Sequence, residues 1–169
     1  MLATGSIVMT TTSKDNRSIE KEKAIDMLNT VITINNDRTE GYETASKETD
    51  EQDLQTLFAQ FTQNSKKCKQ ELVNEVTKLG GTPTEGTKTT GKFFRVWMDV
   101  KVALTGQDRK AILSSCEYGE DIAVDTYEKA LRDNLEDLTA EQQIMLNSQH
   151  ALIKADHDKV NSMRDMLVE

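Results

Sequence analysis

Apolar residues recur at helical spacing through most of the chain, and this pattern predicts four long α-helices. In each segment the apolar positions follow a heptad pattern, recurring every three or four residues, which places them on one face of a helix. The core positions predicted in this way run from Ala24 to Ala45, from Leu54 to Leu79, from Leu113 to Ala130 and from Leu146 to Leu167. The predicted helices cover residues 18–47, 50–79, 108–132 and 140–167. Their similar lengths are typical of a helical bundle, in which each apolar face is buried against the others.

Residues that cap helices mark several of the predicted ends. Ser18 is a candidate cap at the start of the first helix, and Thr49 with Gln52 has the spacing of a capping box before the second. Thr139 with Gln142 has the same spacing before the fourth helix. The pair Gly80-Gly81 is predicted to end the second helix, because glycine readily adopts the left-handed conformation found after helix ends.

The lengths of the connections predict how the helices are arranged. The first and third connections are short, so the helices that they join must be antiparallel neighbours. The second connection, residues 80–107, is long enough to return the chain along the bundle. Its apolar part, GKFFRVWMDVKVALTG at 91–106, predicts a short extra helix. The prediction is an all-α, ferritin-like, up-down-down-up four-helix bundle with one long crossover between the second and third helices.

The first 17 residues differ from the remainder because they lack hydrophobic periodicity. They are rich in Thr and Ser, so we predict a disordered N-terminal tail at 1–17 and a bundle domain at 18–169. Met9 is an alternative to Met1 as the translation start.

Composition agrees with long helices and excludes several classes of function. The chain has one Pro, and 30% of its residues are charged, which favours helices over a β-sandwich or barrel. The net charge of −8 opposes binding to nucleic acid or to an anionic membrane. No apolar run is long enough to cross a bilayer. Two cysteines form no disulfide framework, so we expect a reduced, cytoplasmic protein.

Several polar residues interrupt the apolar faces near the middle of the helices. In a bundle of equal helices these middles meet at one level, which predicts a buried polar layer with Glu117 and His157 at its margin. The residues of this predicted layer are Asn35, Arg38, Ser65, Glu120, Gln149 and Asp156.

Two interpretations of this layer follow, because a buried carboxylate must be paired, protonated or bound to a metal. In the first, Arg38 forks onto Glu120 or Asp156, and the neutral polar residues complete a structural network. In the second, the layer is a metal site whose ligands are Glu117, Glu120, Asp156 and His157. A standard di-iron centre is not expected, because neither His150 nor His157 belongs to a Glu-x-x-His pair.

Other candidate chemistry is sparse. Cys68 and Cys116 lie on apolar faces and are predicted to be inert, buried thiols. No nucleophile is paired with an oriented base, so catalysis is not expected. Phe93, Phe94, Trp97 and Met98 form an apolar patch on the crossover helix. This patch either packs on the bundle or serves as an interface with a partner.

Five segments resemble a bacterial ferritin-like four-helix-bundle family of unknown function. The resemblance covers residues 20–168, and WMD-x-K-x-ALTG followed by CE-x-GED is its most specific part. The segments are LNTVITINNDRTEGYETASKET (28–49), KLGGTP (78–83), RVWMDVKVALTGQDRKAIL (95–113), CEYGEDIAVDTYEKAL (116–131) and QHALIKADHDKVNSMRD (149–165).

The resemblance implies a ferritin-like bundle without an established activity. Relatives in the wider group bind iron or manganese, and some are associated with stress responses. Carried onto this chain, that implies Glu117, Glu120 and His157 as metal ligands. The main expectation is a non-enzymatic protein with a structural or interaction role, related to stress, that forms a homo-oligomer or binds a protein partner. The alternative is an iron- or manganese-binding protein.

Overall fold

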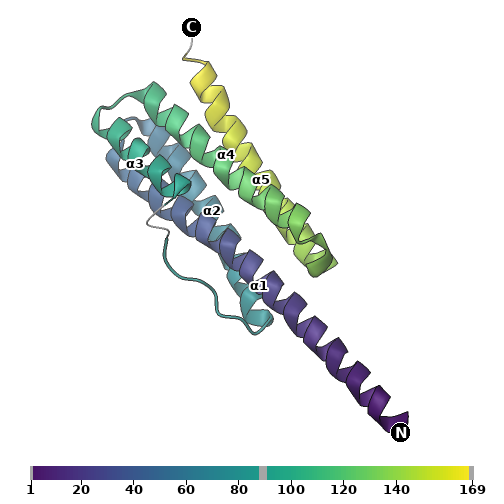
Figure 1. Cartoon of the computed structure of the whole chain (residues 1–169). Helices are drawn as coiled ribbons and strands as arrows, with labels where there is room; N and C mark the ends of the chain where they lie inside the picture. The colour runs from purple at the N-terminus through teal and green to yellow at the C-terminus, as the bar shows by residue number, and fades with distance from the viewer. Residues whose placement is uncertain (1, 88–90, 168–169) are drawn as a thin grey trace.

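The computed structural model describes the backbone of residues 2–87 and 91–167 and the side chains of residues 18–87 and 91–167. Over these residues its regular secondary structure is entirely helical (Figure 1). The four long helices and the short crossover helix predicted above are confirmed. They are α1 (Leu2–Glu48), α2 (Gln52–Lys78), α3 (Lys92–Thr105), α4 (Arg109–Asp133) and α5 (Ala140–Asp165), with a single 3-10 turn, η1 (Leu135–Asp137), before α5.

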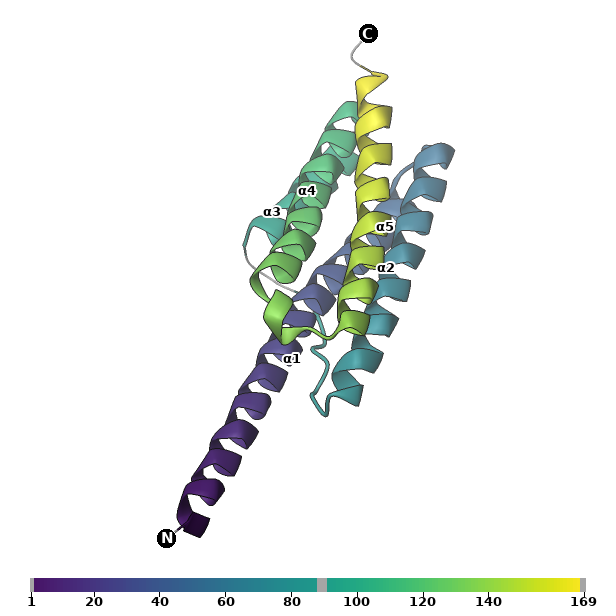
Figure 2. The same cartoon turned by 90° about the vertical axis from the view of Figure 1, so that its right-hand side faces the viewer.

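The long helices form two hairpins, α1 with α2 and α4 with α5, and α3 lies against α1 and α4. In Figures 1 and 2, α1 and α5 run in one direction, whereas α2 and α4 run in the opposite direction. Short loops join the helices within each hairpin, and the long connection that contains α3 joins the two hairpins.

The helix ends agree with two of the predicted signals and disagree with two others. Thr139 and Gln142 form a complete capping box at α5. The backbone N–H of Gly81 donates to Val76 O, and Gly80 has φ of +81°, which ends α2 as predicted. The capping box at Thr49 is wrong, because α2 begins at Gln52 and its N-cap is Glu51. Ser18 caps no helix, because α1 is continuous through this position.

The N-terminal part of α1 extends beyond the other helices (Figures 1 and 2). This part contains residues 2–17, which the sequence predicts as a disordered tail separate from the bundle. Their side chains lie outside the described residues, and so does Met1. The division into a tail and a bundle domain, and the choice between Met1 and Met9 as the start, therefore stay predictions.

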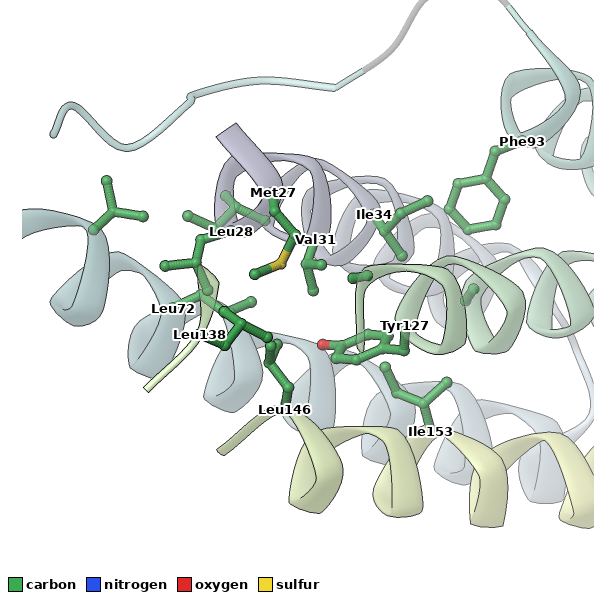
Figure 3. Packing of buried hydrophobic residues seen from close by; sticks show 14 residues of the cluster. Met27, Leu28, Val31, Ile34, Leu72, Phe93, Tyr127, Leu138, Leu146 and Ile153 are labelled. Carbon is green, nitrogen blue, oxygen red and sulfur yellow. The ribbon is translucent and has the colours of Figure 1, made fainter. Parts of the chain in front are cut away.

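Two hydrophobic clusters fill the interior, one toward each end of the bundle. The first contains Leu28 and Val31 of α1, Leu72 of α2, Tyr127 of α4 and Ile153 of α5. In Figure 3, Met27, Leu28 and Val31 of α1 lie opposite Leu146 and Ile153 of α5, with Tyr127 between the two helices. The second cluster uses the other halves of the same helices; its members include Tyr42, Phe58, Phe61, Leu113, Cys116 and Val160.

The predicted core positions are correct along nearly all of each helix. On α1, every predicted position from Ala24 to Ala45 is buried. Leu79 after α2 and Met163 near the end of α5 are half-buried rather than buried. The clearest exception lies after α5, where Leu167 is 39% exposed because the helix has already ended at Asp165. The heptad pattern predicted this position as core, but it lies beyond the end of the helix.

The connection after α2 lies along α1 as far as it is described. Asn29 on α1 donates from Nδ2 to Thr82 O, and its Oδ1 accepts from the backbone N–H of Thr84 at 2.8 Å. Asn36 donates to Gly86 O at 2.9 Å. These side chains replace the backbone partners that an irregular segment lacks, so this part of the crossover has a defined path.

The absence of a side chain at Gly41 allows α3 to approach α1 closely. A Cβ atom added at this position would lie 2.4 Å from the Trp97 ring. The indole packs edge-to-face against Tyr42, with ring centroids 4.9 Å apart, and also against Phe93. Trp97 therefore fastens the crossover helix to the bundle at a point where only glycine leaves enough room.

We predict that Gly41→Ala lowers the free energy of unfolding by about 1–2 kcal/mol. Overpacking costs about 1–3 kcal/mol, and the higher helix propensity of alanine returns up to about 1 kcal/mol. Urea denaturation followed by circular dichroism measures the change. Gly106→Ala is the control, because its added Cβ would meet no atom closer than 3.8 Å. Equal midpoints for the two variants would contradict the close packing of Trp97.

Candidate functional site

The polar layer predicted from sequence lies between the two hydrophobic clusters. All six predicted residues are buried, and each of the four long helices contributes at least one. Every long helix therefore passes from one apolar cluster, through the polar layer, to the other cluster. The members are Asn35 and Arg38 on α1, Ser65 on α2, Glu120 on α4, and Gln149 and Asp156 on α5.

Arg38 is at the centre of this layer and contacts all three of the other long helices. Its Nε and Nη2 donate to the two carboxylate oxygens of Glu120 at 3.1 and 2.6 Å. Nη2 also donates to Asp156 Oδ2 at 3.1 Å, and Nη1 donates to Ser65 Oγ at 2.7 Å. A bidentate guanidinium–carboxylate pair is among the strongest polar contacts in a protein, and here it is fully buried.

Neutral donors support the two carboxylates. Tyr42 donates its hydroxyl proton to Glu120 Oε1 at 2.5 Å, and its ring packs near the guanidinium of Arg38. Asn64 Nδ2 donates to both oxygens of Asp156, at 3.0 and 3.1 Å. Two buried carboxylates against one buried guanidinium leave an excess negative charge, and these donors stabilise it without adding a second cation.

A second branch of the network runs from Asn35 to the surface. Asn35 donates to the hydroxyl oxygen of Tyr127 at 2.8 Å, and Tyr127 donates to Gln149 Oε1 at 2.8 Å. Gln149 Nε2 then donates to Cys68 O and to a carboxylate oxygen of Glu71. The branch crosses from α1 through α4 and α5 to α2, so the polar layer connects all four helices twice.

Burial and charge together determine the protonation states in the layer. Burial opposes the charged form of Arg38, but Glu120, Tyr42 and Asp156 together outweigh it and raise the pKa of the guanidinium. Burial, with the charge of Glu120, raises the pKa of Tyr42 well above its usual value, so the phenol keeps its proton and remains a donor. Burial also raises the pKa of Asp156, in part offset by Arg38 and Asn64.

The four residues proposed from sequence as metal ligands fall into two groups. Glu120 and Asp156 lie in the interior and bond to Arg38. Glu117 and His157 are half-buried, and their partners are different: Glu117 pairs with Arg164, and His157 pairs with Asp121 and Asp158. In the interior, the guanidinium occupies the place between two carboxylates that a metal ion would need.

The second group includes a residue that sequence reasoning missed. Glu117, Asp121 and His157 each offer one ligand atom, and these atoms all lie within 4.8 Å of one another. The signal for Asp121 was present, because it lies one helical turn after Glu117 in the string CEYGED. Burial would lower the pKa of His157, but hydrogen bonds to Asp158 and Asp121 outweigh it and raise that pKa.

The two cysteines, Cys68 and Cys116, are buried and are not joined to each other by a disulfide. Burial raises the pKa of Cys68 to about 11, and that of Cys116 is also raised, by burial and by the charge of Glu120. Both thiols therefore stay protonated at neutral pH, and a protonated, buried thiol is a poor nucleophile. The two histidines hydrogen-bond to carboxylates, His150 to Glu128 and His157 to Asp121 and Asp158.

Part of the apolar patch on α3 packs on the bundle, and part of it is exposed to solvent. Phe93 is buried, and Trp97 packs against Tyr42 and Phe93. Phe94 is half-buried, Met98 is 38% exposed, and Val102 one turn further along is 73% exposed. Phe94, Met98 and Val102 follow one another at four-residue spacing, so α3 presents an apolar stripe to solvent while its opposite side packs on the bundle.

The fold and the layer define the class of this protein: a helical bundle whose interior is joined by a buried arginine–carboxylate network. The chain belongs to the family described as a domain of unknown function, DUF2383, whose model matches residues 23–133. The matched segment contains Arg38, Ser65 and Glu120. No curated protein matches the chain.

Among the described residues, no helix combines the length and the hydrophobicity that crossing a membrane requires. The association with stress implied by the resemblance stays a prediction.

We predict that Arg38→Leu lowers the free energy of unfolding by about 3–5 kcal/mol, because it leaves Glu120 and Asp156 buried without a counter-charge. A thermal melt followed by circular dichroism measures the loss. Arg132→Leu is the control, because that arginine is largely exposed and its change should stay within about 0.5 kcal/mol.

A second variant tests whether the loss of stability comes from buried carboxylates without a counter-charge or from lost packing. Adding Glu120→Leu and Asp156→Leu to Arg38→Leu removes the buried carboxylates and should restore part of the lost stability. A melting temperature for Arg38→Leu equal to that of the natural chain would show that the guanidinium does not hold the interior together.

Proposed function

We propose that this protein is a non-enzymatic, ferritin-like bundle that acts by pairing with a second copy of itself through the groove between α1 and α3. One observation carries the proposal: an apolar stripe on α3 begins in this groove, whose α1 and α3 sides have opposite charges. The ferritin-like part of the proposal is supported by the order of the connections, with two short loops within hairpins and one long crossover that contains α3.

The chemistry of the interior supports a role other than catalysis. Arg38 already supplies the cation between Glu120 and Asp156, which disfavours a metal at this position. Both cysteine thiols hold their protons, and both histidines pair with carboxylates. An enzyme of the nucleophilic type needs a base oriented toward its nucleophile. Among the residues that the structure describes, the cysteines and histidines have no such arrangement.

The groove itself is a cavity of about 200 Å³ between the two helices. Phe94, Trp97 and Met98 of α3 form its apolar side, and Gly41 and Thr44 of α1 form part of the facing side. Val102 continues the apolar stripe beyond the groove. Exposed apolar side chains gathered on one helix face are a common feature of protein interfaces.

Charge complementarity favours a second copy as the occupant. The wall formed by α1 is acidic at Glu40, and the wall formed by α3 is basic at Lys101, both of them exposed. The exposed residues of α3 also include Lys92 and Arg95, against one acidic residue, Asp99, so this helix has a net positive charge. In a two-fold symmetric pair, the same patch meets itself in reverse, so the acidic wall of one copy faces the basic wall of the other.

We predict that the natural chain forms a dimer in a concentration-dependent manner, and that Met98→Glu weakens the dimer at least tenfold by placing a charge in the apolar stripe. Sedimentation velocity over a range of micromolar concentrations measures the association. Ile144→Glu is the control, because this residue is 68% exposed on α5 and lies outside the groove. A natural chain that stays monomeric over this range would overturn the proposal.

Charge reversal separates a second copy from a different partner. Glu40→Lys and Lys101→Glu should each weaken the dimer, because each places like charges opposite one another. Combining them in one chain should restore the association, since the walls are again complementary across a two-fold axis. Weakening by each change without recovery in the double variant would count against self-pairing through this groove.

A further inference from the structure

A second surface feature lies on the seam between α4 and α5. Glu117 and Asp121 are one helical turn apart on α4, and His157 projects from α5 toward them. The side chains of Glu117 and His157 are each only 15% exposed, whereas that of Asp121 is 58% exposed. The cluster therefore has two sheltered ligands and one that opens to solvent.

We propose that Glu117, Asp121 and His157 form a binding site for one divalent transition-metal ion. Imidazole nitrogen and carboxylate oxygen are the donors that Zn²⁺ and related first-row ions take in proteins, at about 2.0–2.2 Å. The three ligand atoms already lie within 4.8 Å of one another. Small rotations of these side chains bring all three onto a shared ion and leave its remaining positions to water.

The orientation of His157 matches that of a metal-binding histidine. Its Nδ1 lies 3.1 Å from Asp158 Oδ1, and its Nε2 is directed toward Asp121 Oδ1 at 2.5 Å. A histidine that binds a metal usually holds its other ring nitrogen on a carboxylate, which fixes the ring and its tautomer. Asp158 would take this supporting role here, and the ion would replace the proton that lies between Nε2 and Asp121.

Arg164 controls access to the site. Its Nη1 pairs with Glu117, so this cation and a metal ion compete for the same carboxylate. Arg164 also donates from Nη2 to Asn161 Oδ1 at 3.1 Å and to Asp165 Oδ1 at 2.9 Å. These alternative partners allow the guanidinium to release Glu117 without losing all of its hydrogen bonds. Removal of Arg164 should therefore strengthen metal binding.

The site is separate from the interior network and from the α1–α3 groove. Glu120 and Asp156, which adjoin Asp121 and His157 in sequence, face the interior and bond to Arg38. Metal binding at the seam therefore neither requires nor excludes self-pairing through α3. The two proposals fail independently, because one is tested by metal titration and the other by the mass of the protein in solution.

We predict that chelator-treated protein binds Zn²⁺ with a stoichiometry near one in isothermal titration calorimetry. His157→Gln and Asp121→Asn should each weaken the affinity at least tenfold, because each removes a direct ligand. Arg164→Gln should raise it several-fold. His150→Gln is the matched control: His150 lies on the same helix and pairs with a single α4 carboxylate, that of Glu128. Its affinity for Zn²⁺ should equal that of the natural chain.

Several results would overturn the site. These are the absence of Zn²⁺ binding up to about millimolar concentration, equal affinities for the natural chain and His157→Gln, or an equal loss in His150→Gln. Circular dichroism of each variant checks that the bundle remains folded. Because the ligands lie on the surface seam, these substitutions should leave the helical signal unchanged. A loss of the heat of binding in a folded variant then shows that the substituted residue is a ligand.

Discussion

The buried contact between Arg38 and Glu120 is the interaction on which the rest of the bundle depends. A carboxylate in an apolar interior is unfavourable unless a cation and hydrogen-bond donors surround it. Arg38 provides that cation, and it reaches Asp156 and Ser65 with the same guanidinium. One side chain thus fixes the relative height of four helices, since displacement of any helix along its axis would separate a charged or hydrogen-bonded pair.

The polar layer also explains why the hydrophobic core is divided in two. Apolar clusters tolerate sliding, because one leucine can replace another at a similar cost. A network with specific donors and acceptors does not tolerate it, and buried polar residues set register in coiled coils for the same reason. The two clusters therefore supply most of the driving force for folding, whereas the layer between them selects one alignment of the hairpins.

Much of the fold and part of the site could be predicted from the sequence. The heptad pattern located Arg38, Glu120 and Asp156 on inward faces, and equal helix lengths placed them at one level. The pattern could not determine which carboxylate Arg38 binds. A rotation of a helix by a few degrees changes which of its residues faces the guanidinium. For the same reason the pattern grouped Glu117 and His157, at the margin of the layer, with Glu120 and Asp156 as one set of candidate ligands, whereas they meet Asp121 outside the layer.

The position of Arg38 in the chain has a consequence for the order of folding. Its partner Ser65 is 27 residues away, but Glu120 and Asp156 are 82 and 118 residues away. Closing the first of these contacts needs only the α1–α2 hairpin, and contacts between distant residues form more slowly. The guanidinium is therefore incompletely neutralised until the second hairpin docks. The docking step brings both carboxylates at once, so joining the hairpins should be cooperative, and a half-assembled bundle should have little stability of its own.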